Sequence, residues 1–192
     1  AVLALASSGL HSNGYSLVRR VVSAAGWGLD REVPELGRTL GEELLTPTRV
    51  YAADLLAVIR DPQVQLHALS HVTGGGLAAN LARVLPPGLV AGVDRGTWAP
   101  PPVFGLVQRL GQVPSDDLER TLNMGVGFVA VLPPAGVARA VQVLGERGLS
   151  AWQVGEVGTL RPTDRAQQGE LVSGSKGVDG GSVQMMGGYR TS

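Results

Sequence analysis

The 192-residue sequence contains no cysteine, which excludes disulfides, thiolate catalysis and cysteine-based zinc sites. Charge of neither sign is in surplus, since 16 basic residues balance 16 acidic ones, so the total favours neither nucleic acid nor an anionic membrane as partner. No apolar run approaches the roughly 18 residues that a membrane span needs. The apolar start is too short for a signal peptide and lacks its basic region. We therefore expect a cytoplasmic protein that can bury one core.

Several catalytic signatures are also missing. No Gly-Lys-Ser/Thr follows a glycine-rich loop, so there is no Walker A sequence. Neither G-x-S-x-G nor H-E-x-x-H occurs, and the adjacent acidic pairs at 42–43 and 116–117 cannot face each other on a helix. We accordingly predict no metal site within these residues.

Hydrophobic periodicity predicts alternating short strands and helices in irregular order. The expected strands cover 2–5, 65–72, 89–93, 126–132 and 151–157, and the expected helices cover 14–25, 34–44, 49–59, 77–84, 103–110, 116–122 and 134–145. Because the order departs from strict βαβ units, we expect an α+β fold, a layered α/β/α domain with a mixed sheet.

Two parts of the chain are predicted. Residues 1–160 would form the domain, and 161–192 would be a Gly/Ser/Gln-rich tail that adds little to the core and can be mobile. The chain starts inside a predicted strand without an initiator Met, which suggests a piece of a longer protein. If so, an unpaired apolar first strand could drive self-association.

The most informative segment is Ser-Gly-Leu-His-Ser-Asn-Gly-Tyr-Ser-Leu-Val-Arg at 8–19. It places small and hydrogen-bonding residues between a buried strand and a helix. Backbone N–H groups at such a junction favour negative charge. The segment therefore predicts an anion-binding turn at one sheet edge, with His11, Ser12 and Asn13 beside it.

A second polar junction is the loop Thr73, Gly74, Gly75 and Gly76, which follows His71. Three consecutive glycines allow positive φ and a close approach to a ligand, and a following helix would direct N–H groups at a phosphate. A flexible turn that binds nothing explains the same residues, and the spacing does not separate the two.

Both histidines at these junctions have two interpretations. A neutral imidazole can hold a phosphate or amide oxygen or move a proton near neutral pH. Alternatively, each imidazole satisfies a local backbone group. The helical arginines (Arg83, Arg109 and Arg120) are expected on solvated faces, and Trp98 and Trp152 are expected to pack in or near the core.

These motifs resemble blocks of the phosphoribosylformylglycinamidine cyclo-ligases, the aminoimidazole ribonucleotide synthetases of purine biosynthesis. Similar blocks occur in the same order at 8–19, 44–51, 71–86, 120–127 and 151–157. The resemblance implies a carboxy-terminal domain of an ATP-dependent ligase. That enzyme phosphorylates the formyl amide oxygen of formylglycinamidine ribonucleotide and closes the imidazole ring, releasing ADP and phosphate.

By the same resemblance, His11 and His71 would be catalytic, and Ser12, Asn13, Thr73, Gly74, Gly75 and Gly76 would bind substrate or phosphate. ATP and Mg²⁺ would be bound mainly by a missing amino-terminal domain, because its Asp-Gly-Val-Gly-Thr-Lys-like loop is absent from this sequence. The complete protein would be a homodimer, and this piece alone would be inactive. Two alternatives stay open: a non-catalytic phosphate- or nucleotide-binding module, and another member of the same ATP-dependent superfamily.

Overall fold

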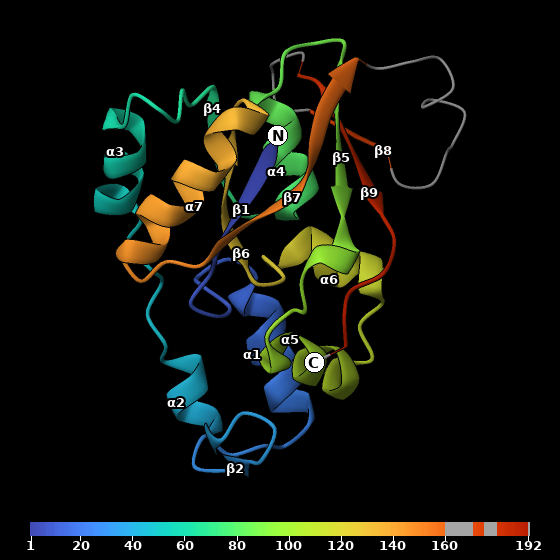
Figure 1. Ribbon diagram of the computed structural model, residues 1–192. Coiled ribbons are helices and arrows are strands. Elements are labelled where there is room, and N and C mark those ends of the chain that lie inside the picture. The colour runs from blue at the N-terminus through green and yellow to red at the C-terminus, as the bar shows by residue number, and fades with distance from the viewer. Residues whose placement is uncertain (160–170, 175–179, 192) are drawn as a thin grey trace.

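A computed structural model describes residues 1–159, 171–174 and 180–191 (Figure 1). Its main feature is a seven-stranded sheet in the order β4-β6-β1-β7-β5-β9-β8. All neighbouring strands are antiparallel except β5 and β9, which are parallel, so the predicted mixed sheet of an α+β fold is confirmed. The strands are β1 (Val2–Ala6), β4 (Ala68–His71), β5 (Leu89–Asp94), β6 (Val126–Val131), β7 (Ala151–Thr159), β8 (Leu171–Ser173) and β9 (Ser182–Met186).

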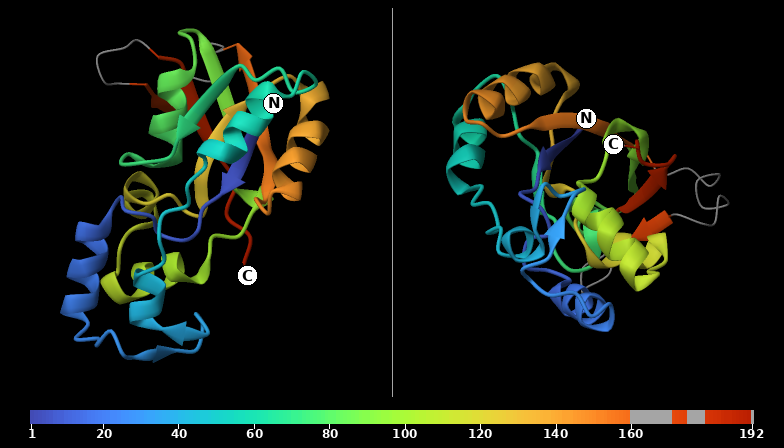
Figure 2. Two further views of the ribbon diagram at one scale, coloured as in Figure 1. Left: turned by 90° about the vertical axis from the view of Figure 1, so that its left-hand side faces the viewer. Right: turned by 90° about the horizontal axis from the view of Figure 1, so that it is seen from below.

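Helices cover both faces of this sheet (Figure 2). Along β1 the side chains alternate in direction: Val2 and Ala4 belong to the core beneath α4 (Gly76–Val84), whereas Leu3 and Leu5 belong to the core beneath α3 (Ala52–Arg60) and α7 (Val137–Glu146). Burial on both faces explains why β1 is a continuous apolar run. Because β1 lies between β6 and β7, the hypothesis of an unpaired first strand is wrong.

The other helices gather at one end of the sheet around a third core. They are α1 (Tyr15–Ala24), α2 (Leu40–Leu44), α5 (Pro102–Gly111) and α6 (Ser115–Thr121). Short 3₁₀ turns, η1 (Arg95–Thr97) and η2 (Pro134–Gly136), precede α5 and α7. No helix in the described ranges has the length and apolar character needed to cross a bilayer.

The predicted helix over 34–44 is wrong for its first half. Strands β2 (Glu32–Val33) and β3 (Arg38–Thr39) form a small hairpin, and its turn contains Gly37 at a φ of +66°. The helix starts only at Leu40, because Thr39 caps it. The Thr39 hydroxyl accepts a hydrogen bond from the Glu42 N–H, and the Glu42 carboxylate accepts one from the Thr39 N–H. A hairpin followed by a helix thus satisfies the same leucine spacing as one continuous helix.

The segment after residue 160 adds more to the core than predicted. β9 pairs in parallel with β5, and β8 pairs with β9. Val183 is fully buried and Met185 nearly so, both in the core beneath α4. The prediction of little core is therefore wrong for these strands. The rest of the predicted tail (161–170, 175–179 and 192), including its expected mobility, lies outside the described residues.

One edge of the sheet collects the polar loops. β1 and β4 are both antiparallel to β6, and β1 and β5 are both antiparallel to β7, so β1, β4 and β5 run in the same direction. β9 runs parallel to β5. The carboxyl ends of these four strands therefore meet at one edge, which we call the loop edge: residues 7–14, 72–75, 95–101 and 187–191.

Candidate functional site at the loop edge

The turn after β1 holds His11 in a fixed and strained position. His11 has a φ of +57°, in the left-handed region that few side chains adopt. Its Nε2 accepts a hydrogen bond of 3.1 Å from the Ser8 N–H. The buried Asn123, in the segment between α6 and β6, supports the turn, because its Nδ2 donates to the carbonyls of Gly9 and Leu10 at 2.9 and 3.0 Å. The sequence therefore specifies one orientation of the imidazole.

The protonation state of His11 follows from these contacts. Since Nε2 accepts a hydrogen bond, a neutral ring carries its proton on Nδ1. The side chain is only 6% exposed, and its Nδ1 atom is buried without a hydrogen-bond partner among the described residues. A buried donor without a partner is costly in a folded protein. His11 thus retains one buried N–H donor that has no acceptor among the described residues.

Tyr51 lies between the two histidines. Its ring centroid is 6.1 Å from that of His11 and 6.5 Å from that of His71, which stacks on Phe128 at 4.7 Å. The Tyr51 hydroxyl donates a hydrogen bond of 2.7 Å to the Ala6 carbonyl, and burial raises its pKa. The two predicted catalytic histidines are therefore neighbours, separated by an uncharged phenol.

Gly127 makes this arrangement possible. A Cβ atom at this position would lie 1.9 Å from the Tyr51 hydroxyl oxygen and 2.8 Å from His11 Cε1. Both rings pack directly against the backbone of β6, where only glycine leaves space for them.

We expect His11 to stay neutral at pH 5. Burial, and to a lesser extent the nearby His71, lower the pKa of His11 to about 4, and desolvation also lowers that of His71. The unfolded chain binds this proton near the ordinary value of 6.5. The free energy of unfolding should therefore fall as the pH falls from about 6.5 to 4, by at most about 3 kcal/mol.

NMR titration of the imidazole signals and urea unfolding at several pH values measure both effects. His11→Asn is the matched variant, because asparagine tolerates a left-handed φ but carries no titrating group. It should flatten the pH dependence. Protonation of folded His11 at pH 6 would contradict the expectation.

Asn80 gives the glycine loop its shape. This buried residue in α4 donates from Nδ2 to the carbonyls of Thr73, Gly74 and Gly76, at 3.2, 3.4 and 2.7 Å. Its Oδ1 accepts a hydrogen bond of 3.1 Å from the Thr73 hydroxyl. One amide side chain thus occupies the loop carbonyls, so the loop has a defined conformation.

The glycine loop and the His11 turn meet. A Cβ atom at Gly74 would lie 3.7 Å from Asn13 Nδ2, so the exposed Asn13 side chain lies beside the loop. Ser12 is also exposed, and its hydroxyl lies 3.2 Å from that of Thr48. The structure thus places both motifs in one site, as their positions at strand ends predict. The ligand roles of these residues stay predictions.

Known proteins are similar in sequence to this domain. Residues 1–161 match the family described as AIR synthase related protein, C-terminal domain. The chain belongs to this family.

Individual relatives of this AIR synthase related domain carry an enzyme name. A Streptomyces fradiae protein, provisionally named a phosphoribosylformylglycinamidine cyclo-ligase, is 60% identical over 171 residues, covering 88% of this chain and 90% of the relative. Phosphoribosylformylglycinamidine cyclo-ligases of an Anaeromyxobacter species and of Pseudothermotoga lettingae are 51% and 46% identical over 165 and 157 residues. These matches cover 84% and 82% of this chain but 47% and 45% of the relatives. The chain thus spans about half the length of these two proteins.

Gly76 of the domain has a packing role that the sequence does not reveal. Its φ is +71°, and a Cβ atom there would lie 1.8 Å from the Glu119 carbonyl oxygen. The first turn of α4 therefore lies directly against the backbone of α6. The left-handed φ and the close helix packing together explain the identity of this third glycine.

Arg83 is a candidate residue that sequence reasoning missed. It was expected on a solvated face, but its Nη1 donates a hydrogen bond of 3.1 Å to Asn80 Oδ1. A Cβ atom at Gly75 would lie 3.3 Å from the Arg83 Nη2. Among the described residues its buried Nε has no hydrogen-bond partner, and no carboxylate pairs with the guanidinium. A cation therefore lies at the glycine loop. The spacing of Asn80 and Arg83 on one helix face after three glycines is the signal that could have indicated it.

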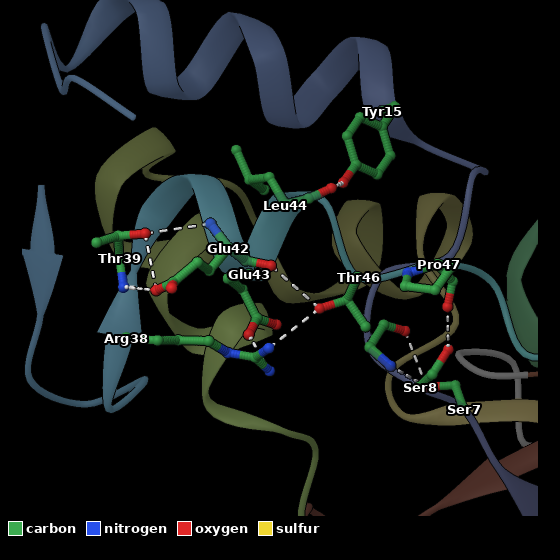
Figure 3. Close-up of polar contacts among 11 residues, drawn as sticks. Ser7, Ser8, Tyr15, Arg38, Thr39, Glu42, Glu43, Leu44, Thr46 and Pro47 are labelled. Atoms are coloured by element: carbon green, nitrogen blue, oxygen red, sulfur yellow. Dashed lines mark hydrogen bonds and ion pairs between the residues drawn. The ribbon is translucent and has the colours of Figure 1, made fainter. Parts of the chain in front are cut away.

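Hydrogen bonds fasten the turn before His11 to the segment before α3 (Figure 3). The Ser8 hydroxyl donates to the Pro47 carbonyl at 2.8 Å and accepts from the Arg49 N–H at 3.1 Å. The Ser7 hydroxyl donates to the Gly9 carbonyl at 2.9 Å. Both serines thus shape the backbone and are not free for a ligand.

The next part of the turn is fixed by α2. The Tyr15 hydroxyl donates a hydrogen bond to the carbonyl of Leu44, which is the last residue of α2 (Figure 3). Glu43, whose side chain is 7% exposed, pairs with Arg38 at 2.7 Å, and Arg38 also donates to the Thr46 hydroxyl at 3.2 Å. The polar groups around α2 are therefore paired with one another, and the Tyr15 contact joins this helix to the end of the His11 turn.

The described residues do not supply a metal centre. In those ranges no three or more His, Asp or Glu side chains gather where they could hold an ion. The donor set of this part of the domain does not fit Mg²⁺, and we assign no step to a metal held by it.

Proposed function

We propose that this chain is the carboxy-terminal half of a phosphoribosylformylglycinamidine cyclo-ligase. The complete enzyme would convert formylglycinamidine ribonucleotide to aminoimidazole ribonucleotide in purine biosynthesis. The observation that carries the proposal is the meeting of the His11 turn and the glycine loop at one edge of the sheet. The names of the relatives and their greater length support it.

In the proposed reaction, the formyl amide oxygen takes a phosphoryl group from ATP, with release of ADP. An internal nitrogen then closes the imidazole ring and phosphate leaves. An amide oxygen is a poor leaving group, and phosphorylation improves it while positioning favours ring closure. ATP and Mg²⁺ would be bound mainly by the amino-terminal half, and the complete protein would be a cytoplasmic homodimer.

The residues of this chain would bind and orient the substrate. Neutral His11 would donate its Nδ1–H to an oxygen of the substrate. The neighbouring His71, which is exposed, would accept or return a proton. The glycine loop from Thr73 to Gly76, together with Ser12 and Asn13, would hold a phosphate at the start of α4. Arg83 would add a positive charge to that position.

A chimera tests this proposal. The chain would replace the matching half of the Anaeromyxobacter enzyme, and ATP-dependent ring closure would be measured for the chimera and for the chain alone. We expect turnover by the chimera only, and about a hundredfold lower kcat for His11→Asn in it. A folded chimera without turnover would favour a binding module, and turnover by the chain alone would contradict the shared site.

A further inference from the structure

A cavity of about 510 Å³ opens at the loop edge on the face opposite the histidines. It lies between α4 and α6 on one side and η1, β8 and β9 on the other. Leu77, Trp98 and Met185 in its wall belong to the core beneath α4, whereas Tyr51 beside the histidines belongs to the core beneath α3 and α7. Its volume is typical of small-molecule sites, at roughly 300–1,000 Å³.

The apolar wall is rigid and aromatic. Trp98 donates from Nε1 to the Met124 carbonyl at 2.9 Å, and its ring meets Tyr189 edge-on, at 5.1 Å between centroids and 72° between planes. Met124 and Met185 complete this wall with polarizable thioethers. Fixed aromatic rings and methionine sulfurs are well suited to contact a planar ring.

The charged residues among the described lining of the cavity are equal in number for the two signs. Arg95 and Glu119 form a two-pronged ion pair, at 2.8 and 3.0 Å, with side chains only 10% and 18% exposed. Asp116 and Arg120 are exposed at the rim, one of each sign. An interior of this kind favours an uncharged ring with polar edges over a charged group.

Next to Gly75 the balance changes in favour of an anion. Gly75 lines the cavity and also belongs to the glycine loop, which begins α4. The Arg83 guanidinium reaches this position, and no described carboxylate neutralises it. An anionic group attached to a ring in the cavity would therefore lie against the loop and the Arg83 side chain.

We infer that the cavity binds a nucleotide, with its heterocycle between Trp98 and the methionines and its phosphate at Gly75 and Arg83. The inference rests on the proposed function for the phosphate position at the glycine loop, and it adds the cavity as the binding site of a heterocycle. The ligand has two conceivable sources, a purine nucleotide or an imidazole ribonucleotide, which share this chemistry.

Calorimetry with the 192-residue chain tests the inference with three probes: adenosine monophosphate, 5-aminoimidazole-4-carboxamide ribonucleotide and ribose 5-phosphate. At least one ring-bearing probe should bind ten times or more tightly than ribose 5-phosphate, because only it fills the cavity. The tighter of the two nucleotides identifies the source. Equal affinity for ribose 5-phosphate, or no binding of either nucleotide at millimolar concentration, would overturn the proposal.

Two variants locate the site, each with a matched control. Ala78→Phe fills the cavity and Arg83→Gln removes the positive charge, and each should weaken nucleotide binding about tenfold or more. Ala53→Phe and Arg60→Gln change exposed positions on α3 and should leave it unchanged. Should Ala78→Phe fail to fold, Arg83→Gln still decides. Nucleotide binding that Arg83→Gln leaves unchanged would place the ligand elsewhere and overturn the proposal.

Discussion

Replacing Gly76 by alanine is expected to lower the free energy of unfolding by about 3–5 kcal/mol. The left-handed φ of +71° strains any L side chain. In addition, the new Cβ atom would lie 1.8 Å from the Glu119 carbonyl oxygen, a backbone atom that no rotamer change can move. Relief requires α4 to separate from α6, which would disrupt the core around Leu77. Urea unfolding monitored by circular dichroism measures the loss.

Gly88→Ala is the matched control for this change. Gly88 has a φ of +82°, but a Cβ atom there would have no neighbour within 4 Å. It therefore reports the backbone strain alone, about 1–2 kcal/mol. The difference between the two variants isolates the cost of the close helix approach. Equal losses would show that α4 and α6 are not in direct backbone contact.

The second large effect is expected at Glu119. Glu119→Ala removes both hydrogen bonds of the buried ion pair with Arg95, which should cost about 3–5 kcal/mol. Arg95 also donates to the Gly187 carbonyl at 3.2 Å, so its displacement would loosen the segment after β9. Hydrogen exchange of the β9 amides should increase more than that of the β1 amides.

The control for this charge is the exposed pair of Glu35 and Arg109. Their side chains are 37% and 61% exposed, so solvent screens the attraction and Glu35→Ala should cost less than about 1 kcal/mol. A loss at Glu119 as small as that at Glu35 would mean that the Arg95 charge is stabilised by other groups.

The sequence predicts those parts of the fold that depend on local patterns. The apolar runs of β1 and β6 are diagnostic, since strands covered on both faces need no alternation. The segment 34–44 is not predictable in this way, because Leu36, Leu40 and Leu44 reach the core from a hairpin and a helix as well as from one helix. β9 was missed for another reason: its burial depends on pairing with β5, about 90 residues earlier.

The candidate site shows the same division. The positions of His11, Asn13 and the glycine loop follow from their motifs at strand ends. The role of Gly127 as a platform for two rings, and the return of Arg83 to the loop, depend on contacts between distant segments. Residue types and spacing indicate which groups are available, whereas the packing of β6 and α4 decides which of them meet.

The central position of β1 has a consequence for biosynthesis. The strand at the start of this chain pairs with residues that follow much later, Val2 with Val131 and with Gly155. At a translation rate of roughly 5–20 residues per second, Val2 waits on the order of 10–30 s for its second partner. During this time the apolar β1 lacks the strand that pairs with it on its second side in the sheet. We therefore expect the nascent chain to need a chaperone holdase until β7 has left the ribosome, so that folding is completed only after most of the domain has been synthesised.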